Sequence, residues 1–132
     1  MMGNKFLKKT VLLVDDDADL IDIYVDYMKF LGFEHIITAS NGEDAVTKYK
    51  THLPDLVLMG ENMQKMNGIT AFNVIKNLNK DVDVIFLTSD THNPTLINLE
   101  KDCAVEIISK TVSPPLLITT IQKHIVQSSR CS

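Results

Sequence analysis

The sequence predicts an α/β domain built on a doubly wound, five-stranded parallel sheet. Five short apolar runs alternate along the chain with five stretches whose apolar residues recur at helical spacing. Several of these runs are continuously apolar, which is typical of strands buried on both faces. Strands that alternate with helices pair in parallel, and the helices cover both faces of the sheet. At 132 residues the chain has the size of one such domain.

The first part of the chain contains two predicted strands and two predicted helices. Thr10–Val14 (TVLLV) is a short apolar run that stops at acidic residues, so we expect a buried strand. Ala18–Leu31 has apolar residues at the spacing of one helical face, and Gly32 is placed to cap its C-terminus. Glu34–Ala39 is short and partly β-branched, which predicts a second strand, and Glu43–Lys50 predicts a brief helix.

The middle of the chain repeats this order. Asp55–Met59 (DLVLM) predicts a third strand, and the residues from 60 to 67 form a loop. Ile69, Phe72 and Ile75 then give the next helix an apolar stripe. Val82–Leu87 predicts a fourth strand.

The last part of the chain completes the alternation. Thr95–Asp102 predicts a short helix and Val105–Ile108 a fifth strand. Ser113-Pro114 is a helix start, because a hydroxyl N-cap precedes a proline in the first turn, where no N–H is needed. The helix that follows has an apolar stripe, made of Leu117, Ile121 and Ile125. We expect the domain to occupy residues 9–127, with flexible termini at 1–8 and 128–132.

Composition excludes several classes of function. The net charge of −4 and the pI of about 5.4 argue against nucleic-acid binding, which needs a basic face. No apolar run reaches the roughly 20 residues of a membrane helix, and the N-terminus is too polar for a signal peptide. The four histidines share no metal-ligand spacing, so we expect them at the surface. The two cysteines support neither a disulfide scaffold nor a zinc site, so together with the absence of a signal peptide and a membrane segment they predict a cytoplasmic location.

Polar residues follow the predicted strands at their carboxyl ends, where sites form in parallel sheets. They are Asp15, Asp16 and Asp17 after the first strand, Gly60 and Glu61 after the third, Thr88 and Ser89 after the fourth, and Ser109 and Lys110 after the fifth. Carboxylate oxygens suit Mg²⁺, and a lysine and a hydroxyl can hold phosphoryl oxygens. The acids alone could equally be helix N-cap and first-turn residues. With Thr88 and Lys110 at matching strand ends, a phosphoryl-handling site is favoured.

Four segments, in order, resemble the response-regulator receiver domains of two-component signalling along nearly all of residues 9–127. They are VLLVDDDADL, PDLVLMGENMQKMNG, VIFLTSD and EIISK. The resemblance implies a flavodoxin-like fold with strand order 2-1-3-4-5.

The resemblance also implies roles for individual residues. Asp15 and Asp16 would bind a metal ion, and Asn62 would contribute a backbone carbonyl. Thr88 would be the hydroxyl that follows the phosphoryl group, and Lys110 the cation that contacts it. The family's partner surface, formed by the fourth helix, fifth strand and fifth helix, would include Leu96, Glu106, Ile107 and Leu117.

The sequence departs from the family where the chemistry matters most. The phosphoacceptor aspartate falls on Gly60, which has no nucleophile. Glu61 is not a ready substitute, because alternation along a strand directs its carboxylate away from the site unless the strand has already ended. Gln64 stands where the family has a proline in the loop after the third strand, and Ile107 stands at its aromatic switch position. Thr111 replaces the proline that follows the family's lysine.

These features favour a stand-alone, degenerate receiver that is not phosphorylated at Gly60 and is not an enzyme. It would act by binding a protein partner (a histidine kinase, a phosphotransfer protein or an output protein), as a monomer or weak homodimer, with at most weak Mg²⁺ binding. One alternative is a working receiver that uses Glu61, or whose native aspartate has been replaced by Gly60. Another is a small phosphohydrolase that uses Asp15, prompted by the acid pattern of Asp15–Asp17.

Overall fold

The computed structural model describes residues 8–101 and 105–126. They form five strands and five helices in strict alternation. In chain order these are β1 (Thr10–Val14), α1 (Ala18–Leu31), β2 (His35–Ala39), α2 (Gly42–His52), β3 (Leu56–Gly60), α3 (Gly68–Leu78), β4 (Val84–Thr88), α4 (Pro94–Leu99), β5 (Val105–Ser109) and α5 (Pro114–Val126). The expected flexible termini lie outside the described residues except for Lys8, and Cys103 also lies outside them.

All four strand pairings are parallel, and the strand order is β2-β1-β3-β4-β5. The chain therefore winds one way from β1 to β2 and the other way from β3 to β5, as predicted. The pairing of Gly60 with Leu87 and of Thr88 with Ser109 brings the carboxyl ends of the central strands to one edge of the sheet.

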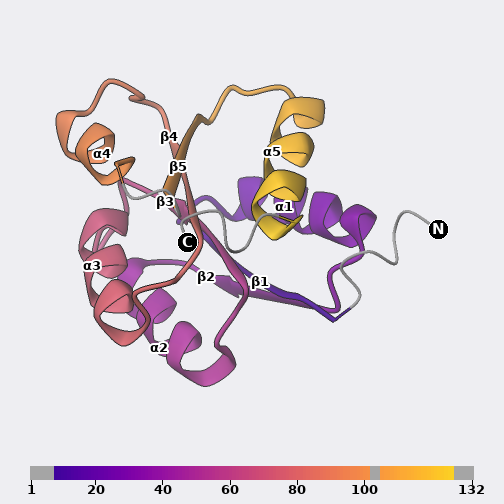
Figure 1. The fold of residues 1–132 in the computed structure, drawn as a ribbon, viewed down its shortest axis with the longest axis horizontal. Coiled ribbons are helices and arrows are strands. Elements are labelled where there is room, and N and C mark those ends of the chain that lie inside the picture. Colours follow the sequence, from indigo (N-terminus) through magenta and orange to yellow (C-terminus); the bar gives the residue numbers. More distant parts are fainter. Residues whose placement is uncertain (1–7, 102–104, 127–132) are drawn as a thin grey trace.

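Helices cover both faces of the sheet (Figure 1). Helices α1 and α5 lie on one face, and α2, α3 and α4 lie on the other. Successive residues of β1 divide between two cores: Val11 and Leu13 pack with the α1/α5 layer, and Leu12 and Val14 with the α2/α3/α4 layer. This arrangement explains why the strand is continuously apolar.

Four predicted strands differ from the observed ones. β2 begins one residue later than predicted. β3 and β4 begin one and two residues later and each ends one residue later, and β5 extends by one residue to Ser109. The shift matters at Gly60, which is the last residue of β3 and not the first residue of the loop. Glu61 is therefore the first residue beyond the strand.

Two predicted surface assignments are wrong. Leu96 and Leu117 are buried in the two cores, because each lies on the apolar side by which its helix packs on the sheet. The large apolar side chains that these helices expose are their neighbours, Ile97 at 46% and Leu116 at 56%.

His124 is likewise not a surface histidine, because its side chain is buried between α5 and the sheet. Its Nε2 lies 3.2 Å from Glu106 Oε1, and its Nδ1 lies 3.7 Å from Asp83 Oδ1. The carboxylates of Asp83, just before β4, and of Glu106 in β5 thus give the imidazole polar partners, which allows it to be buried on the inner side of α5.

Candidate functional site

Asp15 and Lys110 form an ion pair at the carboxyl edge of the sheet. Asp15 follows β1 and is only 3% exposed, and its Oδ2 lies 3.1 Å from Lys110 Nζ. Its other oxygen, Oδ1, accepts a hydrogen bond from the Asp17 N–H at 3.0 Å. Among the described residues, Asp15 Oδ2 is the buried side-chain oxygen without a hydrogen bond of good geometry, so the lysine compensates its charge as an ion pair.

Gly60 ends β3 directly beside this pair. A Cβ atom at position 60 would lie 3.0 Å from Asp15 Oδ2 and 3.2 Å from the Val14 carbonyl oxygen. Both distances are tighter than ordinary van der Waals contact, so a larger residue here would force the Asp15 side chain to shift. The space that a side chain at position 60 would need is thus partly taken by the Asp15 carboxylate.

Glu61 and Thr88 form a second polar cluster. The Thr88 Oγ1 donates a hydrogen bond of 2.5 Å to Glu61 Oε1, and both side chains are buried. The second carboxylate oxygen, Oε2, accepts a 2.5 Å hydrogen bond from Asn93 Nδ2. Asn93 is the N-cap of α4. One carboxylate therefore links the ends of β3 and β4 to the start of α4.

The position of Glu61 corrects the sequence-based expectation. Alternation along β3 does direct Glu61 to the face opposite Gly60, but Thr88 lies on that same face, because Met59 and Phe86 both pack in the α2/α3/α4 layer. The carboxylate is hydrogen-bonded to Thr88, whereas Lys110 pairs with Asp15. Gly60 and Thr88 therefore meet at one edge of the sheet but face opposite sides of it, and Glu61 shares the side of Thr88.

Asp16 and Asn62 complete the predicted site residues, and neither is buried. The described residues contain no group of three or more His, Cys, Asp or Glu side chains arranged to hold a metal ion. Asp15, Asp16 and the Asn62 carbonyl remain as oxygen donors at this edge of the sheet. The unsatisfied oxygen of Asp15 fits a cation, but Lys110 already lies within ion-pair distance of it.

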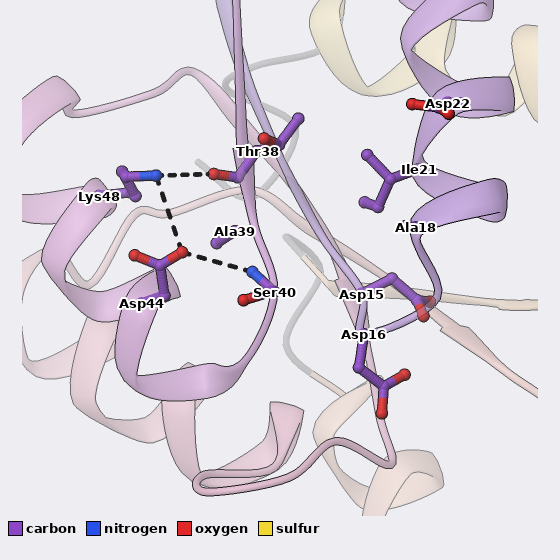
Figure 2. A pocket seen from close by; sticks show the side chains of 10 residues that line it. All are labelled: Asp15, Asp16, Ala18, Ile21, Asp22, Thr38, Ala39, Ser40, Asp44 and Lys48. Carbon is purple, nitrogen blue, oxygen red and sulfur yellow. Dashed lines mark hydrogen bonds and ion pairs between the residues drawn. The ribbon is translucent and has the colours of Figure 1, made fainter.

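A shallow polar pocket of about 320 Å³ opens beside the acids, toward β2. Figure 2 shows that Asp15 and Asp16 lie on one side of it and Asp44 and Lys48 on the other. Lys48 is engaged there, since its Nζ donates to the Thr38 carbonyl at 2.9 Å and lies 3.7 Å from Asp44 Oδ2. The sequence did not predict this pocket, because its two walls come from different parts of the chain.

Burial and nearby acids perturb a tyrosine behind the site. Burial, followed by the charge of Asp15 and then by Tyr27 and Asp17, raises the pKa of Tyr24 from 10.0 to about 12. The phenol is therefore neutral at physiological pH and packs from α1 into the core.

The family model of the response regulator receiver domain matches residues 11–122. The chain belongs to this family. The match covers nearly all of the sheet and most of α5, so the receiver fold and the place of the chain in two-component signalling follow from it.

Relatives agree with this assignment of the receiver domain. The chain is 34% identical to the chemotaxis protein CheY of Bacillus subtilis over 86% of its own length and 94% of that protein. It is 32% identical to CheY of Thermotoga maritima over 87% of its length and 96% of that protein. A chain in the crystal structure of the CheX–CheY–BeF₃–Mg²⁺ complex from Borrelia burgdorferi superposes with a TM-score of 0.80, at 29% identity and 92% coverage of each chain.

No helix within the described part of this receiver domain combines the length and apolarity that crossing a membrane requires. The fourth helix, fifth strand and fifth helix present a mixed surface instead. Ile97 and Leu116 are its exposed large apolar residues, and Glu106 and Ile107 of β5 are partly exposed.

Proposed function

We propose that this chain is a stand-alone receiver domain that signals without phosphorylation at position 60, by binding another protein in the cytoplasm. One observation carries the proposal: β3 ends in a glycine beside a buried Asp15 that is paired with Lys110. No carboxylate oxygen is available at position 60 to take a phosphoryl group. The lysine that would contact such a group instead neutralises Asp15.

Glu61 is a poor substitute acceptor. Its two carboxylate oxygens already accept short hydrogen bonds from Thr88 and Asn93, and its side chain is only 7% exposed. A phosphodonor would have to reach a buried oxygen and displace one of these donors. Lys110, which would contact the phosphoryl group, is paired with Asp15 and not with Glu61.

The partner surface we propose is formed by α4, β5 and α5. Ile97 and Leu116 supply exposed apolar area, and Glu106 and Ile107 add partly exposed area from the strand, in place of the buried Leu96 and Leu117. The partner would be a histidine kinase, a phosphotransfer protein or an output protein. The net charge of −4 disfavours nucleic acid, and the chain would act as a monomer or weak homodimer.

A weak Mg²⁺ site belongs to the same proposal. Asp15, Asp16 and the Asn62 carbonyl are suitable hard donors, and Mg²⁺ in proteins commonly uses one or two carboxylates together with water. The ion would have to draw Asp15 Oδ2 away from Lys110. The Borrelia complex contains Mg²⁺ together with a CheY, which supports metal binding by a receiver domain of this fold.

The proposal is tested by incubating the protein with a small-molecule phosphodonor and millimolar Mg²⁺ and measuring its intact mass. We expect no addition of a phosphoryl group. The CheY of Bacillus subtilis serves as the positive control for the donor. Phosphate recovered on Glu61 or on any aspartate at the carboxyl edge of the sheet would overturn the proposal.

A second candidate is a phosphorylatable receiver whose native aspartate has been replaced by Gly60. The retained Thr88 and Lys110 favour it, and an aspartate codon needs one base change to encode glycine. The Gly60→Asp variant should then become phosphorylated in the same assay. An aspartate codon in the genomic gene would decide for this candidate.

An enzymatic role is the weakest candidate. A phosphohydrolase would use Asp15 as nucleophile, but that carboxylate is buried and paired with Lys110. We expect no turnover of a generic phosphate ester. Turnover that the Asp15→Asn variant abolishes would show that the chain is an enzyme.

A further inference from the structure

Glu61 is a buried carboxylate whose surroundings the receiver assignment does not explain. An ionised side chain is costly to bury unless hydrogen bonds compensate it. Here two 2.5 Å hydrogen bonds do so, one from the Thr88 hydroxyl and one from the Asn93 amide. Hydrogen bonds to a charged acceptor are roughly twice as strong as those between neutral groups.

The backbone of Glu61 is also held. The Gly68 N–H donates to the Glu61 carbonyl at 2.9 Å, at the point where α3 begins. A Cβ atom at position 68 would collide with the Gly60 carbonyl, so only glycine allows this close approach. The residue is thus anchored at both ends, by α3 through its backbone and by Thr88 and Asn93 through its carboxylate oxygens.

The Thr88 hydroxyl has one proton, and its neighbours decide where that proton goes. The Asp90 N–H donates to Thr88 Oγ1 at 2.9 Å, while the hydroxyl donates to Glu61 at 2.5 Å. The competing acceptor, the Asp90 carbonyl, is farther away at 3.3 Å. The hydroxyl is therefore held toward Glu61 in one orientation.

Asn93 passes this constraint on to α4. Its Oδ1 accepts hydrogen bonds from the N–H groups of Thr95 at 2.9 Å and Leu96 at 3.4 Å, which caps the helix. Its Nδ2 donates to Glu61. A six-residue helix is too short to be stable alone, so its placement depends on such anchors and on the buried Leu96.

We propose that Glu61 is a positioning residue that holds Thr88 and α4 in a single arrangement without any phosphoryl group. The carboxylate, supplied by the chain itself, takes the Thr88 hydroxyl and fixes the N-cap of α4. The surface around Ile97 is therefore presented to its partner permanently. This inference rests on the proposed function, because it explains how a receiver that is not phosphorylated can keep one signalling state.

An exchange of donor and acceptor tests the link. Asn93→Asp keeps an N-cap acceptor for α4 but places a second carboxylate against Glu61, and the two like charges repel. We expect the melting temperature to fall by about 5–10 °C. Amide hydrogen exchange within α4 should become about tenfold faster or more, because the helix loses its anchor.

The double variant Glu61→Gln/Asn93→Asp restores the pair with its polarity reversed. The new amide at position 61 then donates to the new carboxylate at position 93, and its carbonyl still accepts from Thr88. We expect most of the lost melting temperature and the slow exchange of α4 to return. Asn67→Asp is the matched control, because it makes the same change at the N-cap of α3, where Asn67 accepts from the Thr70 N–H.

Three outcomes would overturn the inference. The first is unchanged amide hydrogen exchange in α4 of the Asn93→Asp variant, and the second is an equal fall in melting temperature in Asn67→Asp. The third is a double variant that recovers neither the melting temperature nor the slow exchange of α4. The phosphodonor assay remains separate from this test. Phosphate uptake by the wild-type protein would refute the proposed function while leaving the measured link between Glu61 and α4 intact. Absence of uptake together with unchanged exchange would refute the positioning role alone.

Discussion

At the scale of single residues, the Asp15–Lys110 pair decides the charge balance of the site. Asp15 is buried while Lys110 is partly exposed, so removing the lysine leaves a buried carboxylate without compensation. We expect Lys110→Met to lose about 2–3 kcal/mol of unfolding free energy, somewhat less than for a fully buried pair. Urea denaturation measures this loss. The double variant Asp15→Asn/Lys110→Met should recover part of it, and a double variant as unstable as the sum of the singles would contradict the pairing.

Tyr24 provides a prediction about pH at the same scale. Burial and the charge of Asp15 raise its pKa to about 12, above the 10.0 of a free phenol. The folded state thus favours the protonated phenol. The stability that the Tyr24 phenol contributes is therefore complete below pH 10 and is lost as the pH rises through about 12. Stability measured between these values should fall more steeply in the wild-type protein than in Tyr24→Phe. Equal slopes would show that Tyr24 ionises normally.

At the scale of elements, caps fix where the helices begin. Asp17 is the N-cap of α1, and its Oδ1 accepts from the N–H groups of Asp19 and Leu20. Asp17→Ala should cost about 1 kcal/mol of unfolding free energy, the usual value for losing such a cap. Asp19→Ala, an exposed first-turn acid nearby, is the control and should cost less. If both variants lose a similar unfolding free energy, the loss comes from removing a negative charge near the N-terminus of the helix dipole and not from removing the cap.

The sequence predicted the order of the elements, and it predicted α1 to the residue. Helical periodicity and the αL cap at Gly32 mark that helix clearly. The predicted ends of β3, β4 and β5 are each one residue too early, because Gly60, Thr88 and Ser109 continue the strands although each was expected to follow one. Helical spacing predicts that the stripe with Leu117 is core, which is confirmed, so the place of Leu117 on the partner surface that the family resemblance implies is wrong.

The site was predictable only in part, for a physical reason. Residues at strand ends meet because parallel strands share an edge, so the closeness of Asp15, Gly60 and Lys110 follows from the fold. Which face each side chain takes beyond a strand depends on the loop. The hydrogen bonds of Glu61 with Thr88 and Asn93, and the burial of His124, required the structure.

At the scale of the whole molecule, the effect of Mg²⁺ on thermal stability measures whether the site at the carboxyl edge of the sheet still binds a metal ion. A ligand stabilises the folded protein only in proportion to its binding, by about 2.7 kcal/mol at 100 times its Kd. Without a carboxylate at position 60, and with Lys110 beside Asp15, we expect millimolar Mg²⁺ to shift the melting temperature of the wild-type protein very little.

The Gly60→Asp variant should behave in the opposite way. Its new side chain would crowd Asp15 Oδ2 and add a second negative charge beside it, so the metal-free variant should melt below the wild type. A third carboxylate would complete a hard-oxygen site, so millimolar Mg²⁺ should raise its melting temperature by several degrees, and EDTA should reverse the gain. Calorimetry with and without Mg²⁺, with Ca²⁺ at the same ionic strength as a control, measures both effects. If Mg²⁺ does not raise the melting temperature of the variant, a missing carboxylate at position 60 does not explain the weak metal site. Competition from Lys110 for Asp15 is then the remaining cause.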